Sequence, residues 1–465
     1  MRLPIYALLP LGFLQSLGAQ ARPAEPTLAL TNVTVVDVKT GALRPGRTVT
    51  IKAGRIATIA PFRAGARVIG QQIDGSGKFL IPGLWDMHVH LAFGDWFPGA
   101  REIALPMFVA NGVTGVRDMG SDLAPVVAWR KEIGAGALLG PRILTSGPML
   151  DGPKPRFPSS VAIATPADGR RAVRDLERQG VDFIKFQSLI PRAAVFAITE
   201  EAKRRHIVVA GHVPDAVRAS EASAAGQKSF EHLIGVFEGS SPDETGFLTG
   251  PKSPGRFLAS YDPARAAALF SVLARNRTWQ CPTLVWERGG ALMDDRDLAN
   301  DPLKKYAPAS WTEQAWRRFT DEIVQGYVDD LSTRKRFVAK ELEVVGELHR
   351  AGVRFLAGTD TPPGVFVFPG FSLHDELELF VQAGLTPREA LETATRNPAI
   401  YLGLDRQLGA VEPGLLADLV LLDANPLEAI GNTRKIAAVI ARGRYLPRAE
   451  LDGLLSQAEA AAARQ

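Results

Sequence analysis

The chain has 465 residues, of which 46% are hydrophobic and 22% are charged, and its formal net charge is +4. These proportions are those of an ordinary globular protein with ample material for a hydrophobic core. The small net charge, without a dense stripe of Lys and Arg, gives no case for nucleic-acid binding. The single cysteine, Cys281, rules out an internal disulfide and is expected to pack in the core rather than act as a nucleophile.

The first 21 residues have the pattern of an export signal. Arg2 supplies a positive charge, the segment Leu3–Leu17 is mostly apolar, and Ala19–Ala21 fits a cleavage site of small residues. A retained membrane anchor is the alternative, but the apolar run is too short and too interrupted to span a bilayer. We therefore expect a periplasmic or secreted protein with no membrane anchor after cleavage of residues 1–21.

Both ends of the remaining chain are rich in β-forming residues. Residues 22–80 predict short strands and turns, including a hairpin that turns at Ala53-Gly54. Residues 405–450 return to the same pattern, so the two segments are expected to form one small β-sandwich domain. The tail, residues 451–465, is alanine-rich from Ser456 and is expected to be a frayed helix or disordered.

Between these segments, residues 81–404 alternate short apolar strands with helical stretches, which is the pattern of βα units around a parallel sheet. Helices are predicted at 166–179 and 192–205, and a pair of helices across 373–391. The predicted strands are 84–90, 113–118, 142–146, 182–186, 207–212, 229–232, 278–284 and 353–360. Eight is the strand count of a (β/α)8 TIM-like barrel, so the expected fold class is α/β, with the β-sandwich appended to the barrel.

The first predicted barrel strand carries two histidines, His88 and His90, separated by one apolar residue. Residues i and i+2 of a strand point to the same face, so both imidazoles are directed at one point. Neutral imidazole is a common zinc ligand. Two unrelated surface histidines are the alternative, but the chain has only seven histidines, and the pairing favours a metal site.

Six polar side chains, including these two histidines, fall at or near the ends of predicted strands. They are His88, His90, Lys185, His212, His232 and Asp360. Each has an ordinary explanation when taken alone: Lys185, for example, could pair with Asp182. A closed barrel brings the carboxyl ends of its strands to one rim, and together these residues indicate a metal centre there.

This pattern resembles the amidohydrolase superfamily, and most of all its branch of imidazolonepropionase-like enzymes and metal-dependent, prolidase-like dipeptidases. The resemblance covers nearly all of the mature chain. It includes Pro82-Gly83 before the histidine pair, Val113–Asp118, the Gly358–Asp360 strand end and Ala417-Asp418 near the C-terminus.

The resemblance implies two divalent metal ions, with zinc as the expected metal. His88, His90 and Asp360 would hold the first ion, and His212 and His232 the second. Lys185 would be carboxylated by CO2 and would bridge both ions. The strong local positive charge of two dications disfavours the ammonium form of this lysine, which leaves a neutral amine that can react with CO2.

The implied reaction is hydrolysis of an amide bond in a small-molecule substrate, either a peptide or an N-acyl amino acid. A metal-bridging hydroxide would attack the carbonyl, and Asp360 would take the proton and pass it to the leaving amine. A dipeptidase of the prolidase-like type is the expected enzyme.

Three other functions remain open from the sequence. A lactone or ester hydrolase could use the same metal centre. A mononuclear cyclic amidase or deaminase would lack a ligand at Lys185, so this lysine argues against it. A non-catalytic binding protein of this superfamily would tend to have lost ligands, and here all six positions are filled.

Arg117, which ends the second strand beside Asp118, is predicted either to support the metal ligands or to contact the substrate, and substrate contacts are predicted at Lys154 and Arg156, in the loop 147–160. A structural ion pair is the alternative for Arg117, and solvation is the alternative for the two loop residues. The exact substrate, the metal, the oligomeric state and the roles of the long connections 233–277 and 285–352 are not determined by the sequence; a homo-oligomer is one option.

Overall fold

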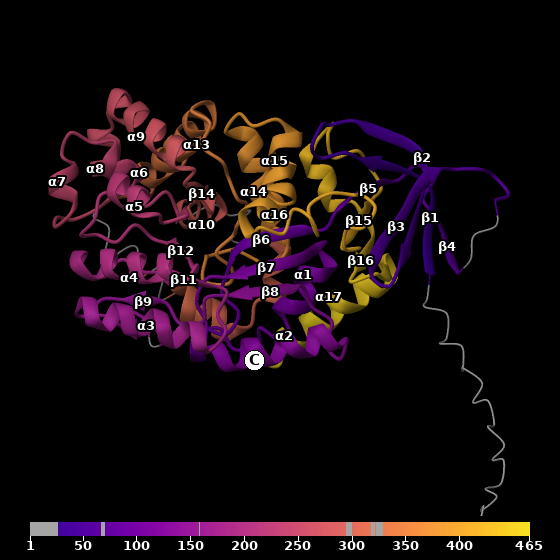
Figure 1. The fold of residues 1–465 in the computed structure, drawn as a ribbon, viewed down its shortest axis with the longest axis horizontal. Helices are drawn as coiled ribbons and strands as arrows, with labels where there is room; N and C mark the ends of the chain where they lie inside the picture. The colour runs from indigo at the N-terminus through magenta and orange to yellow at the C-terminus, as the bar shows by residue number, and fades with distance from the viewer. Residues whose placement is uncertain (1–26, 67–69, 158, 294–299, 318–320, 322–328) are drawn as a thin grey trace, which may run out of the picture.

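The structure, a computed structural model, describes residues 27–465 apart from 67–69, 158, 294–299, 318–320 and 322–328 (Figure 1). The predicted export signal lies outside the described residues, as does part of the connection 285–352. Two regions make up the described part: a mainly antiparallel sheet to one side, and a larger α/β region.

The antiparallel region is one eight-stranded sheet built from both ends of the chain. Its strands are β1 (Thr27–Val36), β2 (Leu43–Lys52), β3 (Arg55–Pro61), β4 (Gln71–Asp74), β5 (Phe79–Pro82), β15 (Leu419–Leu422), β16 (Ile436–Ala441) and β17 (Arg444–Pro447). The order is β17-β16-β15-β5-β1-β2-β3, with β4 paired to β1. The expected union of the two terminal segments is therefore present, whereas their arrangement as two packed layers stays a prediction.

The sheet is held by the alternation of its β-branched and apolar residues. Val33 and Val35 of β1 point to the same side and pack in one buried cluster with Ile51 of β2 and Leu421 of β15. This cluster joins residues from opposite ends of the chain, so the sheet is completed only by the C-terminal segment.

The α/β region contains two parallel sheets. The first has the order β6 (Leu84–Val89), β7 (Val113–Asp118), β8 (Arg142–Thr145); the second has the order β10 (Val161–Ala162), β9 (Leu150–Asp151), β11 (Phe183–Phe186), β12 (Val208–Gly211), β13 (Ser229–Glu231), β14 (Trp279–Cys281). Within the described residues these sheets do not close into one continuous eight-stranded barrel, so the sequence prediction of a closed sheet is not met.

The reason lies at the expected eighth strand, 353–360. This segment forms only single bridges, from Phe355 to Gln280 of β14 and from Thr361 to Val89 of β6. It still spans the gap between the two sheets, because Leu356 N–H donates to Gln280 O at 2.9 Å and Met87 N–H donates to Ala357 O at 2.8 Å. The order of the strands around the site thus follows the prediction, although the segment 353–360 forms no continuous ladder of hydrogen bonds with its neighbours.

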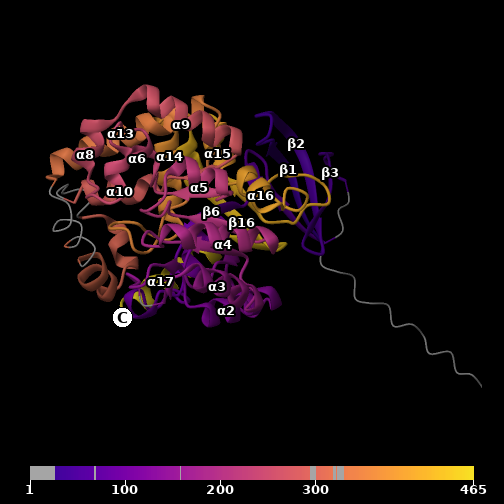
Figure 2. The same ribbon diagram turned by 60° about the vertical axis from the view of Figure 1, so that its left-hand side comes forward.

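Helices alternate with the parallel strands and cover them from outside (Figures 1 and 2). They are α1 (Ala104–Ala110), α2 (Leu123–Ala135), α3 (Pro166–Arg178), α4 (Arg192–Arg204), α5 (Ala219–Ala225), α6 (Val236–Gly239), α7 (Glu244–Phe247), α8 (Pro254–Ser260), α9 (Pro263–Asn276), α10 (Leu284–Ala291), α13 (Leu331–Arg350), α14 (Phe371–Gln382), α15 (Pro387–Thr393), α16 (Arg396–Leu402) and α17 (Arg448–Ala462). The helices predicted at 166–179, 192–205 and 373–391 are confirmed as α3, α4, and the pair α14 and α15.

The tail forms the ordered helix α17, so the prediction of a frayed or disordered tail is wrong. Leu451, Leu454 and Ala458 are buried because they recur every three or four residues and form one apolar face. This face packs against α1 and β16. In the described part of the chain, no helix combines the length and apolar character required to cross a bilayer.

Candidate metal centre

The six predicted ligands converge on one cavity of about 560 Å³, which all of them line. They are His88 in β6, His90 directly after it, Lys185 in β11, His212 after β12, His232 after β13, and Asp360 in the connecting segment. The structure therefore brings together residues that are up to 272 positions apart in the sequence, counted from 88 to 360.

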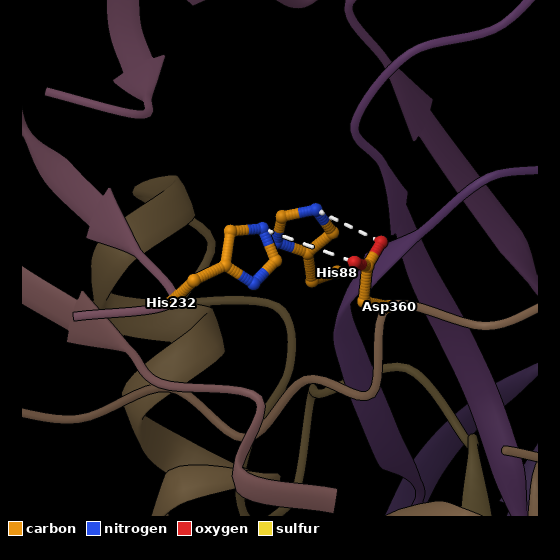
Figure 3. A group of neighbouring side chains, drawn as sticks. All are labelled: His88, His232 and Asp360. Carbon is orange, nitrogen blue, oxygen red and sulfur yellow. Dashed lines mark ion pairs between the residues drawn. The ribbon is translucent and has the colours of Figure 1, made fainter. Parts of the chain in front are cut away.

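Asp360 lies between three of the histidines. Its Oδ1 is 3.1 Å from His90 Nε2 and 3.5 Å from His88 Nε2, and its Oδ2 is 3.9 Å from His232 Nε2. Figure 3 shows the imidazoles of His88 and His232 directed at this carboxylate from two different segments. One nitrogen or oxygen atom from each of His88, His232 and Asp360 lies within 4.8 Å of the others, which is the spacing of ligands around a metal ion.

Each of the four histidines is held through its Nδ1 atom. His88 Nδ1–H donates to Glu231 at 2.9 Å, and His90 Nδ1–H donates to the carbonyl of Gly120 at 2.7 Å. A hydroxyl is the partner in the other two cases: Ser188 for His212 at 2.9 Å, and Thr283 for His232 at 2.6 Å. An imidazole held at Nδ1 presents Nε2 as its ligand atom, as in metal-binding histidines generally.

The environment of the His88 Nε2 atom fits a cation. This nitrogen is buried and has no hydrogen-bond partner among the residues that the structure describes. Its nearest carboxylate oxygen, from Asp360, is 3.5 Å away, which is beyond a normal hydrogen bond. A buried polar atom without a partner is rare, and a metal ion bound between these two atoms would satisfy both.

The protonation states also suit metal binding. Burial, reinforced by the positive charge of Lys185, places the pKa of His88 and of His212 well below the usual value. Burial lowers the pKa of His232 to about 4, although Asp360 opposes the shift. These imidazoles are therefore neutral at pH 7, which is the form that binds metal ions.

Lys185 is an unusual lysine because it is only 1% exposed. Burial lowers its pKa to about 8, against the opposing attraction of Glu231 and Asp360. Its amine is thus much closer to neutrality at pH 7 than an ordinary lysine. For Asp360, burial raises the pKa, but the adjacent imidazoles of His90 and His232 outweigh this and hold it below the usual value, so the carboxylate is ionised.

Arg117 does not contact the cavity, and its predicted role as a substrate contact is not supported by its position. Its guanidinium is fully buried, donates to both oxygens of Glu231 at 3.0 and 2.9 Å, and donates to Met87 O at 2.6 Å. Glu231 in turn holds His88. Its position agrees with the other role predicted for it, support of a ligand, because Arg117 acts on His88 through its ion pair with Glu231.

The other two predicted substrate contacts differ from each other. Arg156 lines the cavity, with its guanidinium 5.6 Å from the ring centre of Phe157. Both side chains are exposed, but Lys154 is not among the described residues that line the cavity. Cys281 is buried, as predicted, and burial places the pKa of its thiol well above the usual value, so it is not a thiolate nucleophile.

Backbone conformation directs two of the ligands. His232 and Asp360 have φ angles of 59° and 56°, in the left-handed region that non-glycine residues seldom adopt. Asp86 ties the segment before Asp360 to β6: its carboxylate accepts the backbone N–H groups of His88 at 3.2 Å and of Thr359 at 3.1 Å. Such conformations persist where surrounding contacts fix them, often at functional sites.

The residues that support the ligands were not identified from the sequence. Glu231, Ser188 and Thr283 each hold one histidine, and Glu231 is adjacent to His232 in the chain. The sequence contained one indication for Glu231: it lies two residues from Ser229, so on a strand both side chains point to the same face. In the structure these two residues of β13 are hydrogen-bonded at 2.6 Å.

Comparison with known proteins agrees with this geometry. The chain is 26% identical over 410 residues to an ochratoxinase of Aspergillus niger, which covers 76% of this chain and 71% of that protein. It is 26% identical over 397 residues to an imidazolonepropionase of Ralstonia nicotianae, covering 82% of this chain and 87% of that one. A crystal structure of a candidate prolidase from Bifidobacterium longum superposes with a TM-score of 0.66 and 28% identity, covering 94% of this chain and 100% of that one.

The family comparison extends across both regions of the fold. The sequence profile of the Amidohydrolase family matches residues 79–446, which run from β5 to β17 and include all six ligands. Fold relatives of this kind have a TIM-barrel arrangement, with which the strand order around the site agrees. The chain therefore belongs to the amidohydrolase superfamily of hydrolases, in its imidazolonepropionase-like and prolidase-like branch.

Proposed function

We propose that the protein is a binuclear metal-dependent hydrolase that cleaves amide bonds in small peptides or N-acyl amino acids. The observation that carries the proposal is the orientation of four histidines whose Nδ1 atoms are all held from behind. They share the cavity with a buried lysine and an ionised aspartate. The family relationship, the arrangement of the polar side chains around the cavity and the neutral state of the imidazoles support the same chemistry.

His88, His90 and Asp360 would hold one divalent ion, and His212 and His232 the other, with zinc as the expected metal. Lys185 would bridge them as a carbamate: the lone pair of the neutral amine forms a bond to the carbon of CO2, and a proton leaves the nitrogen. Its lowered pKa supports this reaction because it increases the neutral fraction. The bound ions would supply an acidified water at neutral pH and polarise the carbonyl of the substrate.

Asp360 is the residue that moves the proton. Its Oδ1 atom lies nearest to the two histidines of the first ion, and its pKa is held low, so the carboxylate is ready to accept a proton. It would then donate that proton to the leaving amine, which needs it because an amide anion is a very poor leaving group. The same residue thus acts first as the base and then as the acid.

The cavity suits a small organic substrate. Its volume lies within the range of ligand sites, and its lining combines aromatic side chains with charged groups. We extend the proposal to an exported location, supported by the pattern of residues 1–21, where such an enzyme would act on peptides or acylated amino acids outside the cytoplasm.

Metal content per chain tests the proposal. Protein purified in the presence of bicarbonate should hold close to two zinc-like ions, and Lys185→Ala should lose most of the metal and the activity. Lys203→Ala, an exposed lysine of α4, is the matched control and should retain both. Partial restoration of Lys185→Ala by an added short-chain carboxylate would identify the missing group as a bridging carboxylate.

One ion per chain that is unaffected by Lys185→Ala would contradict the binuclear centre and favour the mononuclear alternative, a cyclic amidase or deaminase. Two ions with activity only on esters or lactones would retain the centre and change the substrate. Panels of dipeptides, N-acyl amino acids and lactones separate these outcomes.

A further inference from the structure

One end of the cavity has no part in the metal centre. It is formed by α10 and α13, from which Glu287, Arg334, Phe337 and Glu341 line the cavity. The three residues of α13 are spaced three and four positions apart, so they lie on one face of that helix. This face is buried, with Glu341 only 2% exposed.

Glu341 is the exceptional residue of this group. Its Oε2 atom is buried and has no hydrogen-bond partner among the described residues. Burial and the neighbouring carboxylates of Glu287 and Glu376 all raise its pKa. Glu287 differs, because the charge of Arg334 partly offsets the effect of burial on its pKa. Leaving a carboxyl oxygen buried without a partner is costly.

Two other acidic side chains of the lining are matched by a cation, and a third, Asp151, accepts backbone N–H groups. Asp215 and Glu238 both bind Lys252, at 2.7 and 3.1 Å. No such contact to Glu341 exists within the described part of the chain. Glu341 thus offers the cavity a buried carboxyl oxygen that no described side chain occupies.

Aromatic rings surround this carboxylate. Phe337, one turn before Glu341, lies against Phe257 with ring centres 5.8 Å apart and against Phe237 with ring centres 4.8 Å apart, and Trp286 also lines the cavity. A flexible apolar stem can pack on such rings, and a cation at its end is attracted to their faces as well as to a carboxylate.

We propose that the α10–α13 end of the cavity, with Glu341 as its central group, is a subsite for a cationic group of the substrate, either a protonated amine or a guanidinium on an apolar stem. This inference deepens the proposed function, on which it rests for the identity of the bound molecule as a substrate. A cation within reach of Oε2 stabilises the ionised carboxylate, whereas a neutral group of the same shape offers no such gain.

Binding of small probes tests the subsite without any hydrolysis. Butylammonium, butylguanidinium and the neutral n-butanol would be titrated into the metal-loaded protein and followed by tryptophan fluorescence, to which Trp286 contributes from the lining. We expect both cations to bind at least about tenfold more tightly than the alcohol, the gain of a hydrogen bond to a charged group. Glu341→Gln should remove this preference.

Two variants control the result. Glu343→Gln alters an exposed carboxylate of the same helix and should leave the preference intact. Glu341→Asp keeps the charge and should retain part of the preference, which separates loss of charge from a folding defect. Equal binding of cation and alcohol by the unaltered protein, or equal behaviour of Glu341→Gln and Glu343→Gln, would overturn the proposal.

Substrate kinetics connect the subsite to the reaction. With dipeptides that differ only by a lysine or norleucine side chain, Glu341→Gln should lower kcat/KM about tenfold for the lysine substrate alone. N-acetylated and free forms show whether the bound cation is the side chain or the amino terminus. If the protein hydrolyses none of these peptides but still prefers butylammonium, the amide-hydrolase proposal fails while the cation subsite stands.

Discussion

The two ends of the cavity are buried to a similar depth but are organised in opposite ways. At the candidate metal centre each of the four histidines has its Nδ1 atom held by a specific partner, which leaves Nε2 as the candidate ligand atom. At the α10–α13 end, Glu341 faces the cavity with an oxygen that nothing holds among the described residues. The first arrangement suits a fixed occupant such as a metal ion, whereas the second leaves a carboxyl group without a partner, as expected for a subsite whose occupant binds and dissociates.

The largest effect is expected from breaking the support of the metal centre. Glu231→Gln removes the charge that matches Arg117 and holds His88. We expect the free energy of unfolding to fall by about 3–5 kcal/mol, because a buried guanidinium loses its partner. Metal affinity should fall roughly 10- to 100-fold. Urea denaturation of the metal-free protein and a metal titration measure the two effects.

Glu102→Gln is the control for this change. It alters an exposed carboxylate whose contact with Arg101 is 3.7 Å long, and its effect should stay within about 0.5 kcal/mol. Unchanged metal affinity in Glu231→Gln would show that Glu231 does not orient the ligand.

Acidification should weaken the same region in a defined pH window. The pKa of His232 is about 4 in the folded chain and about 6.5 in the unfolded chain, so between these values the unfolded chain binds the proton more tightly. Stability of the metal-free protein should therefore be complete above pH 6.5 and fall as the pH drops towards 4, by about 3 kcal/mol from this residue. Denaturation midpoints across the window measure it.

His232→Gln isolates this contribution, since the other buried histidines shift in the same direction. The variant should show a shallower decline than the unaltered protein below pH 6.5. Parallel curves for the two proteins would mean that His232 is not held neutral by burial.

At the α10–α13 end of the cavity, substitution of a buried acidic residue should stabilise the protein instead of destabilising it. Glu341→Gln removes a buried carboxyl group that lies near two other carboxylates and whose pKa is raised, so that on folding it must either stay ionised without a partner or take up a proton. We expect the free energy of unfolding to rise by about 1–3 kcal/mol, while Glu343→Gln changes it by less than about 0.5 kcal/mol. A loss of stability in Glu341→Gln would identify Glu341 as a structural residue and remove the contrast between the two ends.

The smallest effect should come from the loop 147–160. Arg156 lines the cavity, whereas Lys154 is exposed and does not. Arg156→Ala should raise KM by about threefold to tenfold through loss of one charged contact, and Lys154→Ala should change it less than twofold. Steady-state kinetics on the best dipeptide measures both. Equal effects of the two changes would place the substrate over the loop rather than within the cavity.

The convergence of the six candidate ligands on one cavity could be predicted from the sequence because most of them follow a local rule. His88 and His90 follow the two-residue alternation of a strand, and His212 and His232 follow short apolar segments whose ends meet at one rim. The supporting partners follow no such rule. Glu231 contacts His88, while its neighbour in the chain, His232, contacts Asp360. Directing these two adjacent side chains into the same site requires the left-handed backbone at His232.

Features set by tertiary contacts were also missed. The tail was expected to fray because alanine-rich sequence alone gives little stability, yet packing against α1 and β16 orders it. The segment 353–360 was expected to be a strand, but it bends to place Asp360 beside the histidines. The carboxylates of α10 and α13 lie in a long connection whose helical pattern gave no sign that it faced the cavity.

The pairing of β5 with β15 has a consequence for synthesis of the protein. The strand of residues 79–82 obtains its C-terminal neighbour only when residues 419–422 exist, roughly 340 residues later. At typical rates of translation, about 5–20 residues per second, that strand edge stays open for tens of seconds. An open edge is a template for pairing with other chains, so the nascent protein is most exposed to aggregation before its last tenth has been made.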